Sequence, residues 1–165
     1  GVKIEGEETG GTFAENSLLK AKAVMEATGL PAIADDSGLC VGALNGGPGV
    51  YSARFGGEGL DDTGRYRLLL QMMHGQADRR AHFHTTITCA FPNGDVLQDD
   101  GEVEGTIAFA PMGENGFGYD PVFFVPDKRK TFAQLSAEEK AEISHRGKAL
   151  RAFKETLKNY LAEHQ

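Results

Sequence analysis

The sequence predicts an α/β or α+β sandwich, in which helices pack on a β-sheet. Helical patterns occupy residues 13–28 and the stretch from about residue 144, and a strand pattern with a period of two lies between them at residues 81–91. Apolar residues make up 40% of the 165-residue chain and charged residues 25%, which is ordinary for a globular protein with a core. Mixed helices and strands favour this class over a helical bundle or a pure β-barrel.

The first helix is predicted over residues 13–28. Thr12 and Glu15 have the spacing of a capping box, and Gly29 followed by Pro31 ends the pattern. A short strand is expected next, at residues 32–36. The glycine-rich stretch from residue 42 to residue 59 is expected to be mostly loop.

The second half of the chain alternates in a similar way. Asp61 or Asp62 is placed to cap a second helix. The strand at 81–91 turns at residues 92–95 and is expected to return over residues 96–109, and residues 121–125 are a further strand candidate. Ser136 and Glu139 form a second capping box. In the last helix we expect the core to be faced by Leu150, Phe153, Leu157 and Leu161.

Charge and cysteine content restrict the class of protein. The formal net charge of −7 argues against broad binding to nucleic acid or to an anionic membrane, since both need a basic surface. No apolar run approaches the ~20 residues of a membrane-spanning helix. Cys40 and Cys89 lie far apart and are expected to be two buried thiols, which matches a reducing cytoplasm.

Two acidic segments are candidates for chemistry. In "ADDSGL", Asp35 and Asp36 end an apolar run, where carboxylates can bind Mg²⁺ or activate a water, although Asp-Ser-Gly is also good turn sequence. Glu7 and Glu8, with Glu15 nearby, offer another carboxylate, or form an ordinary solvated loop.

Three further segments carry glycines, aromatic rings or cations. "GGPGVYSARF" presents Arg54 to a ligand, or is a structural loop that packs Tyr51 and Phe55 inside. "GFGYDPVF" holds two aromatics that can stack on a flat ring, or tucks both into the core. "SHRGKAL" sets cations at a helix start, where anions bind, or is an exposed polar helix start.

A zinc site at His82 and His84 is not expected. The two residues are two positions apart on a predicted strand, so both rings point the same way. A third ligand at a convincing spacing is missing from the sequence.

Five segments follow one another in the sequence: "TFAEN", "ADDSGL", "PGVYSARF", "GFGYDPVF" and "EEKAEISHRGKAL". Their order resembles that of the inosine triphosphate pyrophosphatase family, and the resemblance extends from about Glu7 to the last helix. The resemblance implies a single domain over residues 1–165, with a long, twisted mixed sheet flanked by helices and two lobes with a central cleft. It also implies Mg²⁺-dependent hydrolysis of dITP, ITP and XTP to the monophosphate and pyrophosphate, usually by a homodimer.

The resemblance also implies roles for individual residues. Asp36 resembles the catalytic acid–base residue and metal ligand, Asp35 supports it, and Glu8 resembles a second metal ligand. The residues expected to contact the substrate are Ser37, Lys20, Phe117, Gly118, Tyr119, Asp120, Lys140, His145 and Arg146. Donors such as Arg146 suit the oxygen at C6 of hypoxanthine or xanthine and oppose the amine of adenine.

One family motif does not match. Members begin with a strand and a Thr/Ser-x-Asn-x-x-Lys turn that binds phosphate, and this sequence starts past that point. We therefore expect an N-terminally incomplete domain. The alternative hypothesis is a nucleotide-binding or dimerising module without turnover. A third reading, the Maf-like pyrophosphatases, is opposed by "GFGYDP" and "SHRGKAL".

Overall fold

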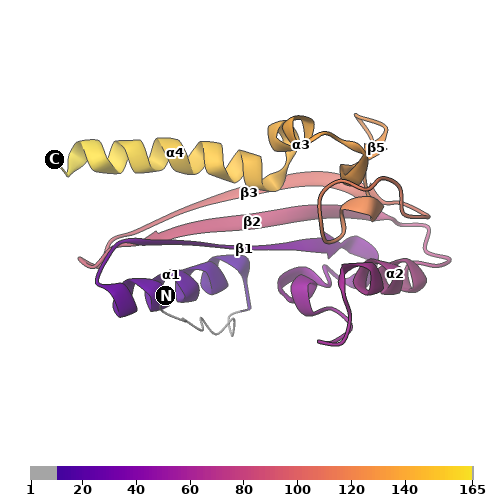
Figure 1. The fold of residues 1–165 in the computed structure, drawn as a ribbon, viewed down its shortest axis with the longest axis horizontal. Helices are drawn as coiled ribbons and strands as arrows, with labels where there is room; N and C mark the ends of the chain where they lie inside the picture. Colours follow the sequence, from indigo (N-terminus) through magenta and orange to yellow (C-terminus); the bar gives the residue numbers. More distant parts are fainter. Residues whose placement is uncertain (1–10, 165) are drawn as a thin grey trace. The chain divides into compact units, whose positions relative to one another are not determined.

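The computed structural model describes residues 11–164 of the chain and confirms an α/β architecture (Figure 1). The helices are α1 (Phe13–Thr28), α2 (Asp62–Met72), α3 (Ala137–Ile143) and α4 (His145–Glu163). The strands are β1 (Ala32–Val41), β2 (Arg80–Ala90), β3 (Val96–Ile107), β4 (Phe123–Val125) and β5 (Lys130–Thr131). Short 3₁₀ turns η1–η4 occupy Gly42–Leu44, Gly49–Arg54, Asp120–Val122 and Phe132–Gln134.

The strands form one five-stranded sheet in the order β1-β2-β3-β4-β5. The described strands pair antiparallel, so the mixed sheet implied by the family resemblance is not found among them. Thr106 lies opposite Phe124, and Phe124 lies opposite Thr131. Short connections join β2 to β3 and β4 to β5, which suits antiparallel pairing, whereas residues 42–79, including α2, lie between β1 and β2.

The helix boundaries follow the capping signals in the sequence. Thr12 accepts a hydrogen bond from the backbone N–H of Glu15 at the start of α1, and Gly29 ends that helix at a φ of 70°. Asp61 caps α2, and Ser136 with Glu139 forms the capping box of α3. These local hydrogen bonds satisfy N–H groups that the helix itself leaves without partners.

β1 is longer than the sequence predicts. The strand continues five residues beyond Asp36, to Val41. Leu39 and Val41 are fully buried in the core, and this burial outweighs the turn preference of the Asp-Ser-Gly segment. The strand therefore carries both aspartates in its middle and not at its end.

The chain divides into two compact units, and each has its own core. The first unit contains residues 1–37, 84–102 and 145–165, with α1, α4 and parts of β1–β3. Its buried cluster joins Ile87 and Cys89 of β2 to Ala149 and Phe153 of α4. Ile87 and Cys89 thus face α4, whereas Thr88, between them, contacts α1. The two helices therefore cover opposite faces of these strands.

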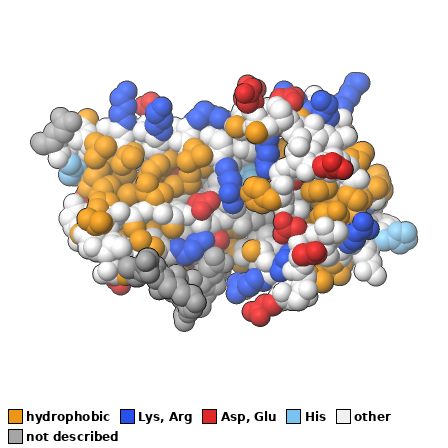
Figure 2. Space-filling model, viewed as in Figure 1, with side chains coloured by type: hydrophobic (Ala, Val, Ile, Leu, Met, Phe, Trp, Pro, Cys, Tyr) orange, Lys and Arg blue, Asp and Glu red, His pale blue; other side chains and the backbone are white. Residues whose placement is uncertain are grey.

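Two of the predicted core positions of α4 are wrong. Leu150 is 58% exposed and Leu161 is 51% exposed, whereas Phe153 is buried and Leu157 is half-buried. The buried row of the helix repeats every four residues through His145, Ala149 and Phe153, and Leu150 stands one position off it. Figure 2 shows apolar side chains gathered on the surface beside α4.

The second unit contains residues 38–83 and 103–144. Its core is built around three phenylalanines: the ring centroids of Phe83 and Phe123 are 4.5 Å apart, and those of Phe123 and Phe132 are 4.9 Å apart. Leu69 of α2 and Met73, the residue that caps its C-terminus, are fully buried in the same cluster. Within residues 11–164, no helix is long and apolar enough to cross a membrane.

Candidate functional site

Asp35 and Asp36 are neighbours on β1, so their side chains leave the strand on opposite faces. Asp36 is 6% exposed and faces α1, where its carboxylate accepts hydrogen bonds from Asn16 Nδ2 at 3.3 Å and Lys20 Nζ at 3.4 Å. Asp35 is half-exposed and faces α4, with its Oδ2 atom 4.0 Å from Arg146 Nη2. A buried carboxylate needs such donors to remain ionised, whereas an exposed one does not.

Helix α1 supplies both donors to Asp36. Asn16 and Lys20 are four residues apart, so they share one face of the helix. Asn16 is fully buried and Lys20 half-buried, which removes much of the water that would otherwise solvate the carboxylate. The result is a desolvated anionic group with one cationic and one neutral donor beside it.

The α4 side of the strands carries a hollow of about 250 Å³, lined by Ile33, Ala34, Asp35, Thr85, Ile87, Arg146 and Leu150. Thr85, one of the lining residues, accepts from the Ser37 hydroxyl at 2.6 Å and donates to the backbone oxygen of Asp36 at 3.2 Å. The lining of the hollow therefore combines apolar side chains with the Asp35–Arg146 ion pair and the Thr85 hydroxyl.

The start of α4 is seated directly on β3. A Cβ atom at Gly101 would overlap the backbone oxygen of His145 and the backbone nitrogen of Ala149, so only glycine fits there. His145 is 6% exposed as a consequence, while Arg146, the next residue, is half-exposed toward the hollow. The two residues of the His-Arg pair thus occupy different environments.

In the second unit, Asp120 joins the aromatic segment to α3. Its buried carboxylate accepts from Lys140 Nζ at 2.5 Å and from the backbone N–H of Phe117 at 3.1 Å. Lys140 Nζ also lies 4.7 Å from the centroid of the Phe117 ring, within range of a cation–π interaction. Gly116 makes room for this carboxylate, because a Cβ there would overlap it and its φ of 77° is left-handed.

The two aromatics of this segment differ in exposure. Phe117 is 59% exposed, and Lys140 lies over its ring. Tyr119 is buried, its hydroxyl donates to the backbone oxygen of Ser52 at 2.6 Å, and burial raises its pKa well above the usual value. Between them, Gly118 donates its backbone N–H to Asp62 Oδ2 at 3.0 Å. The loop is thus held on both sides of an exposed ring.

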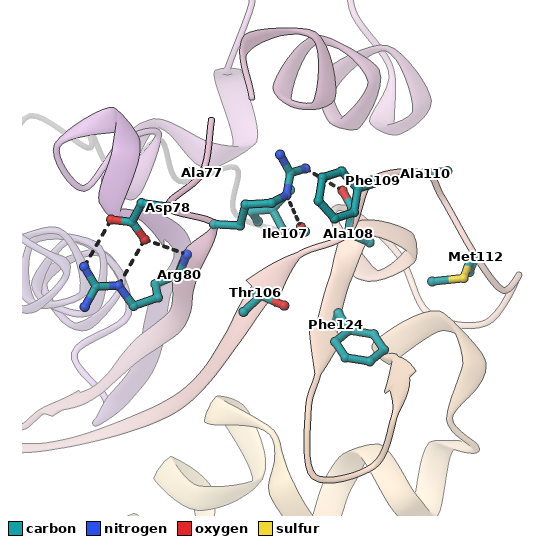
Figure 3. A pocket seen from close by; sticks show the side chains of 11 residues that line it. Ala77, Asp78, Arg80, Thr106, Ile107, Ala108, Phe109, Ala110, Met112 and Phe124 are labelled. Atoms are coloured by element: carbon teal, nitrogen blue, oxygen red, sulfur yellow. Dashed lines mark hydrogen bonds and ion pairs between the residues drawn. The ribbon is translucent and has the colours of Figure 1, made fainter. Parts of the chain in front are cut away.

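A larger hollow of about 760 Å³ lies elsewhere in the second unit, and Figure 3 shows its lining. None of the predicted site residues lines it. Arg79 donates to the backbone oxygens of Ile107 and Ala108 and stacks on the ring of Phe109 with 4.1 Å between Cζ and the centroid. Phe109 itself is 84% exposed. The hollow is therefore an apolar surface feature that none of the residues predicted to bind substrate or metal lines.

The predicted metal ligands and the two cysteines can be compared with the structure. Glu8 lies outside the described residues. Among residues 11–164, no group of three or more His, Cys, Asp or Glu side chains is arranged to hold a metal. Cys89 is buried and Cys40 half-buried, so only one thiol is as hidden as expected.

In the segment of residues 46–55, one predicted core residue is exposed. Tyr51 is 60% exposed, and its ring centroid lies 5.5 Å from Arg54 Cζ. Phe55 is half-buried against the core of the second unit, as expected. The six-residue turn η2 exposes Tyr51 while it buries Ser52, which follows it.

Asn16 and Asp62 have roles that the sequence reasoning missed. Asn16 and Ser17 interrupt the apolar face of α1, and a polar pair at such positions signals buried hydrogen-bond partners. Asp62 was expected only as a possible helix cap, yet its carboxylate holds the backbone at Gly118. The pairing of residues 56 positions apart leaves no local signal in a single sequence.

Comparison with known proteins identifies the family. The Ham1 family model matches residues 1–156. A dITP/XTP pyrophosphatase of Thermus thermophilus is 55% identical over 153 residues, 92% of this chain and 74% of that protein, and one of Desulforamulus reducens is 52% identical over 98% of this chain and 81% of that protein.

Solved structures agree with this result. The Staphylococcus aureus Ham1 protein superposes with a TM-score of 0.91 at 46% identity and covers 95% of this chain and 82% of that one. A nucleoside-triphosphatase / dITP/XTP pyrophosphatase from Mycobacterium abscessus gives 0.80 at 42% identity, over 93% of this chain and 82% of that one. On the evidence of sequence and fold together, the chain belongs to the Ham1 family.

Proposed function

We propose that this chain hydrolyses the non-standard purine nucleoside triphosphates dITP, ITP and XTP to the monophosphate and pyrophosphate, with Mg²⁺ as cofactor. The observation that carries the proposal is the buried Asp36 carboxylate held by Lys20 and Asn16. Relatives that are more than half identical over most of the chain are named dITP/XTP pyrophosphatases, which supports the same reaction.

In this proposal Asp36 acts as the general base. A carboxylate fixed by two donors has a defined orientation, so it can accept a proton from a water that attacks the α-phosphorus. The Lys20 ammonium lies beside the carboxylate and can also bind a phosphate oxygen as a point charge. Ser37, one residue further along β1, adds a hydroxyl from the opposite face.

The donor chemistry at Asp36 fits Mg²⁺. This ion is usually held by one or two carboxylates together with substrate phosphates and waters, and Asp36 supplies one carboxylate. We assign Glu8 as the second. When bound, Mg²⁺ supplies positive charge that neutralises the triphosphate, which an acidic protein of net charge −7 requires.

The base-binding groups are proposed to come from two segments. The exposed face of Phe117 can stack on a purine, and Asp120, Gly118, Tyr119 and Lys140 form the support of that ring. Arg146 and His145 offer N–H donors that match the oxygen at C6. The amine of adenine is itself a donor, so ATP would leave these groups unpaired.

The test is Mg²⁺-dependent pyrophosphate release from ITP, XTP, GTP and ATP. We expect turnover of ITP and XTP at rates at least about a hundredfold above that of ATP, the discrimination expected when buried polar groups are left unpaired. Equal rates on ITP and ATP would refute the specificity. Binding of ITP without pyrophosphate release would instead show a binding module.

We also propose that the chain forms a homodimer, and that the apolar surface around Phe109 is the dimer interface. A projecting ring beside an apolar hollow on one surface allows the same patches of two copies to fill each other, as a two-fold interface requires. Light scattering is expected to show a dimer for the chain and a monomer for Phe109→Asp. A Phe109→Asp variant that stays dimeric would exclude this surface. The cleft between two lobes stays a prediction.

A further inference from the structure

The first two turns of α1 are tied to β2 and β3 by a closed ring of hydrogen bonds. The Ser17 and Thr88 hydroxyl oxygens are 2.6 Å apart, and both side chains are fully buried. Gln98 Nε2 lies 2.9 Å from Thr88 Oγ1 and 3.0 Å from the backbone oxygen of Ala14. Ser17 completes the ring with a bond of 3.1 Å to the same Ala14 oxygen.

One assignment of donors and acceptors satisfies every bond in the ring. The amide nitrogen of Gln98 can only donate, and one of its hydrogens goes to Thr88 and the other to the Ala14 oxygen. Thr88 accepts from Gln98, so its own hydrogen is available for Ser17. Ser17 then donates to Ala14. Every hydrogen in the ring has one acceptor, and removing the Thr88 hydroxyl breaks the bond between β2 and Ser17 of α1 together with the bond between β2 and Gln98.

The same helix face carries the donors of Asp36. Asn16 is adjacent to Ser17, and Lys20 follows Ser17 by three residues, so the ring and the two donors lie on one side of α1. The hydrogen-bonded ring contacts α1 within one helical turn of Asn16 and Lys20, the residues that donate to the Asp36 carboxylate. A shift of α1 along or about its axis would therefore lengthen contacts that are already 3.3 Å and 3.4 Å long.

We propose that the Ser17–Thr88–Gln98 ring sets the position of α1 so that Asn16 and Lys20 hold the Asp36 carboxylate in its reactive orientation. Thr88 is then a positioning residue of the hydrolysis, acting through Lys20 and Asn16 without touching the substrate. This inference rests on the proposed function and deepens it. α1 has a second contact with β2, which supports the proposal that β2 positions this helix. The Phe13 ring stacks on the His84 ring with centroids 5.2 Å apart.

Thr88→Val is the sharpest perturbation, because it keeps the shape of the side chain and removes only the hydroxyl. We expect kcat for ITP to fall about tenfold, since small misplacements of catalytic groups have large effects on rate. Thr88→Ser keeps the hydroxyl and is expected to restore kcat to within about twofold. Thr131→Val is the matched control, since Thr131 is also fully buried and donates its hydroxyl, to the Met112 oxygen.

A double-mutant cycle separates positioning from a general loss of folded protein. In a background that combines Asn16→Ala with Lys20→Met, Thr88→Val is expected to change kcat by less than about threefold, because both contacts that it acts through are already gone. A tenfold loss that persists in that background would overturn the proposal. So would a loss of kcat in Thr131→Val equal to that in Thr88→Val.

A structural measurement tests the inference without an activity assay. Crystal structures of the Thr88→Val and Thr131→Val variants would report the distance between Lys20 Nζ and Asp36 Oδ1. We expect it to exceed 4 Å in Thr88→Val and to stay near 3.4 Å in Thr131→Val. An unchanged distance in Thr88→Val overturns the inference. A chain that shows the expected displacement but fails to hydrolyse ITP would refute the proposed function alone.

Discussion

Replacement of Lys140 by methionine tests how the exposed Phe117 ring is supported. The side chain of Lys140 ends 2.5 Å from Asp120 Oδ2, and only 5% of the Asp120 side chain is exposed. Methionine keeps most of the length and apolar volume of lysine and removes the charge. The variant therefore leaves a buried carboxylate with its remaining donors, which include the backbone N–H of Phe117.

The size of the effect follows from this burial. Removing one partner of a buried ion pair costs about 3–5 kcal/mol, because the other charge stays buried. Lys140 is 19% exposed, so part of its charge is already solvated and we expect the lower end, about 3 kcal/mol. Asp120→Asn in the Lys140→Met background is expected to return about 1–2 kcal/mol, since the amide removes the unpaired charge.

Equilibrium urea unfolding followed by circular dichroism measures these free energies. Lys128→Met serves as the control, because Lys128 is exposed in a turn of the same unit and should change stability by less than about 0.5 kcal/mol. A Lys140→Met variant within about 1 kcal/mol of the parent would refute the reasoning. The absence of any recovery with Asp120→Asn would show that buried charge is not the cause.

Three further predictions concern packing and titration. Gly101→Ala is expected to lower the free energy of unfolding by at least about 2 kcal/mol, measured in urea, because the added Cβ overlaps the backbone of His145. The raised pKa of Tyr119 means that the unfolded chain ionises first above about pH 10, so stability falls there as pH rises. In the Tyr119→Phe variant, the free energy of unfolding measured in urea should fall less steeply with pH above about pH 10. The same dependence on pH in the variant and the parent would contradict this prediction. Burial raises the pKa of the Cys89 thiol, so we expect Cys89 to resist iodoacetamide at pH 8 until urea unfolds the chain. Rapid labelling of Cys89 itself in the native chain, distinguished from the half-buried Cys40 by peptide mass spectrometry, would disprove this.

Much of the helical structure could be predicted because its signals are local. The start and end of α1 are at the predicted residues, since Thr12, Glu15 and Gly29 act within one turn of the helix. The capping box at Ser136 is confirmed for the same reason. Such hydrogen bonds depend on neighbouring residues alone, and a single sequence displays them.

The length of β1 could not be predicted from local chemistry. Asp36, Ser37 and Gly38 favour a turn, and only burial of Leu39 and Val41 in the core of the second unit extends the strand. The extension places Asp35 and Asp36 in the middle of a strand, where they must face opposite sides. The different partners of the two aspartates follow from that geometry and not from their own sequence.

The candidate site was only partly visible in the sequence. Motif order pointed to Asp36, Lys20 and Arg146, but it gave no sign that Arg146 approaches Asp35 and that Lys20 approaches Asp36. Asn16 was inconspicuous because its partner lies 20 residues away. Contacts between distant residues are set by packing, and a single sequence does not display them.

The most direct test of the proposed function is the rate of pyrophosphate release from ITP by Asp36→Asn. Asparagine keeps the size of the side chain and can still accept from Lys20, but it cannot take a proton from water. We predict a fall in kcat of about a thousandfold with ITP binding retained, and no fall for the exposed control Asp127→Asn. An Asp36→Asn variant within tenfold of the parent rate would contradict the account.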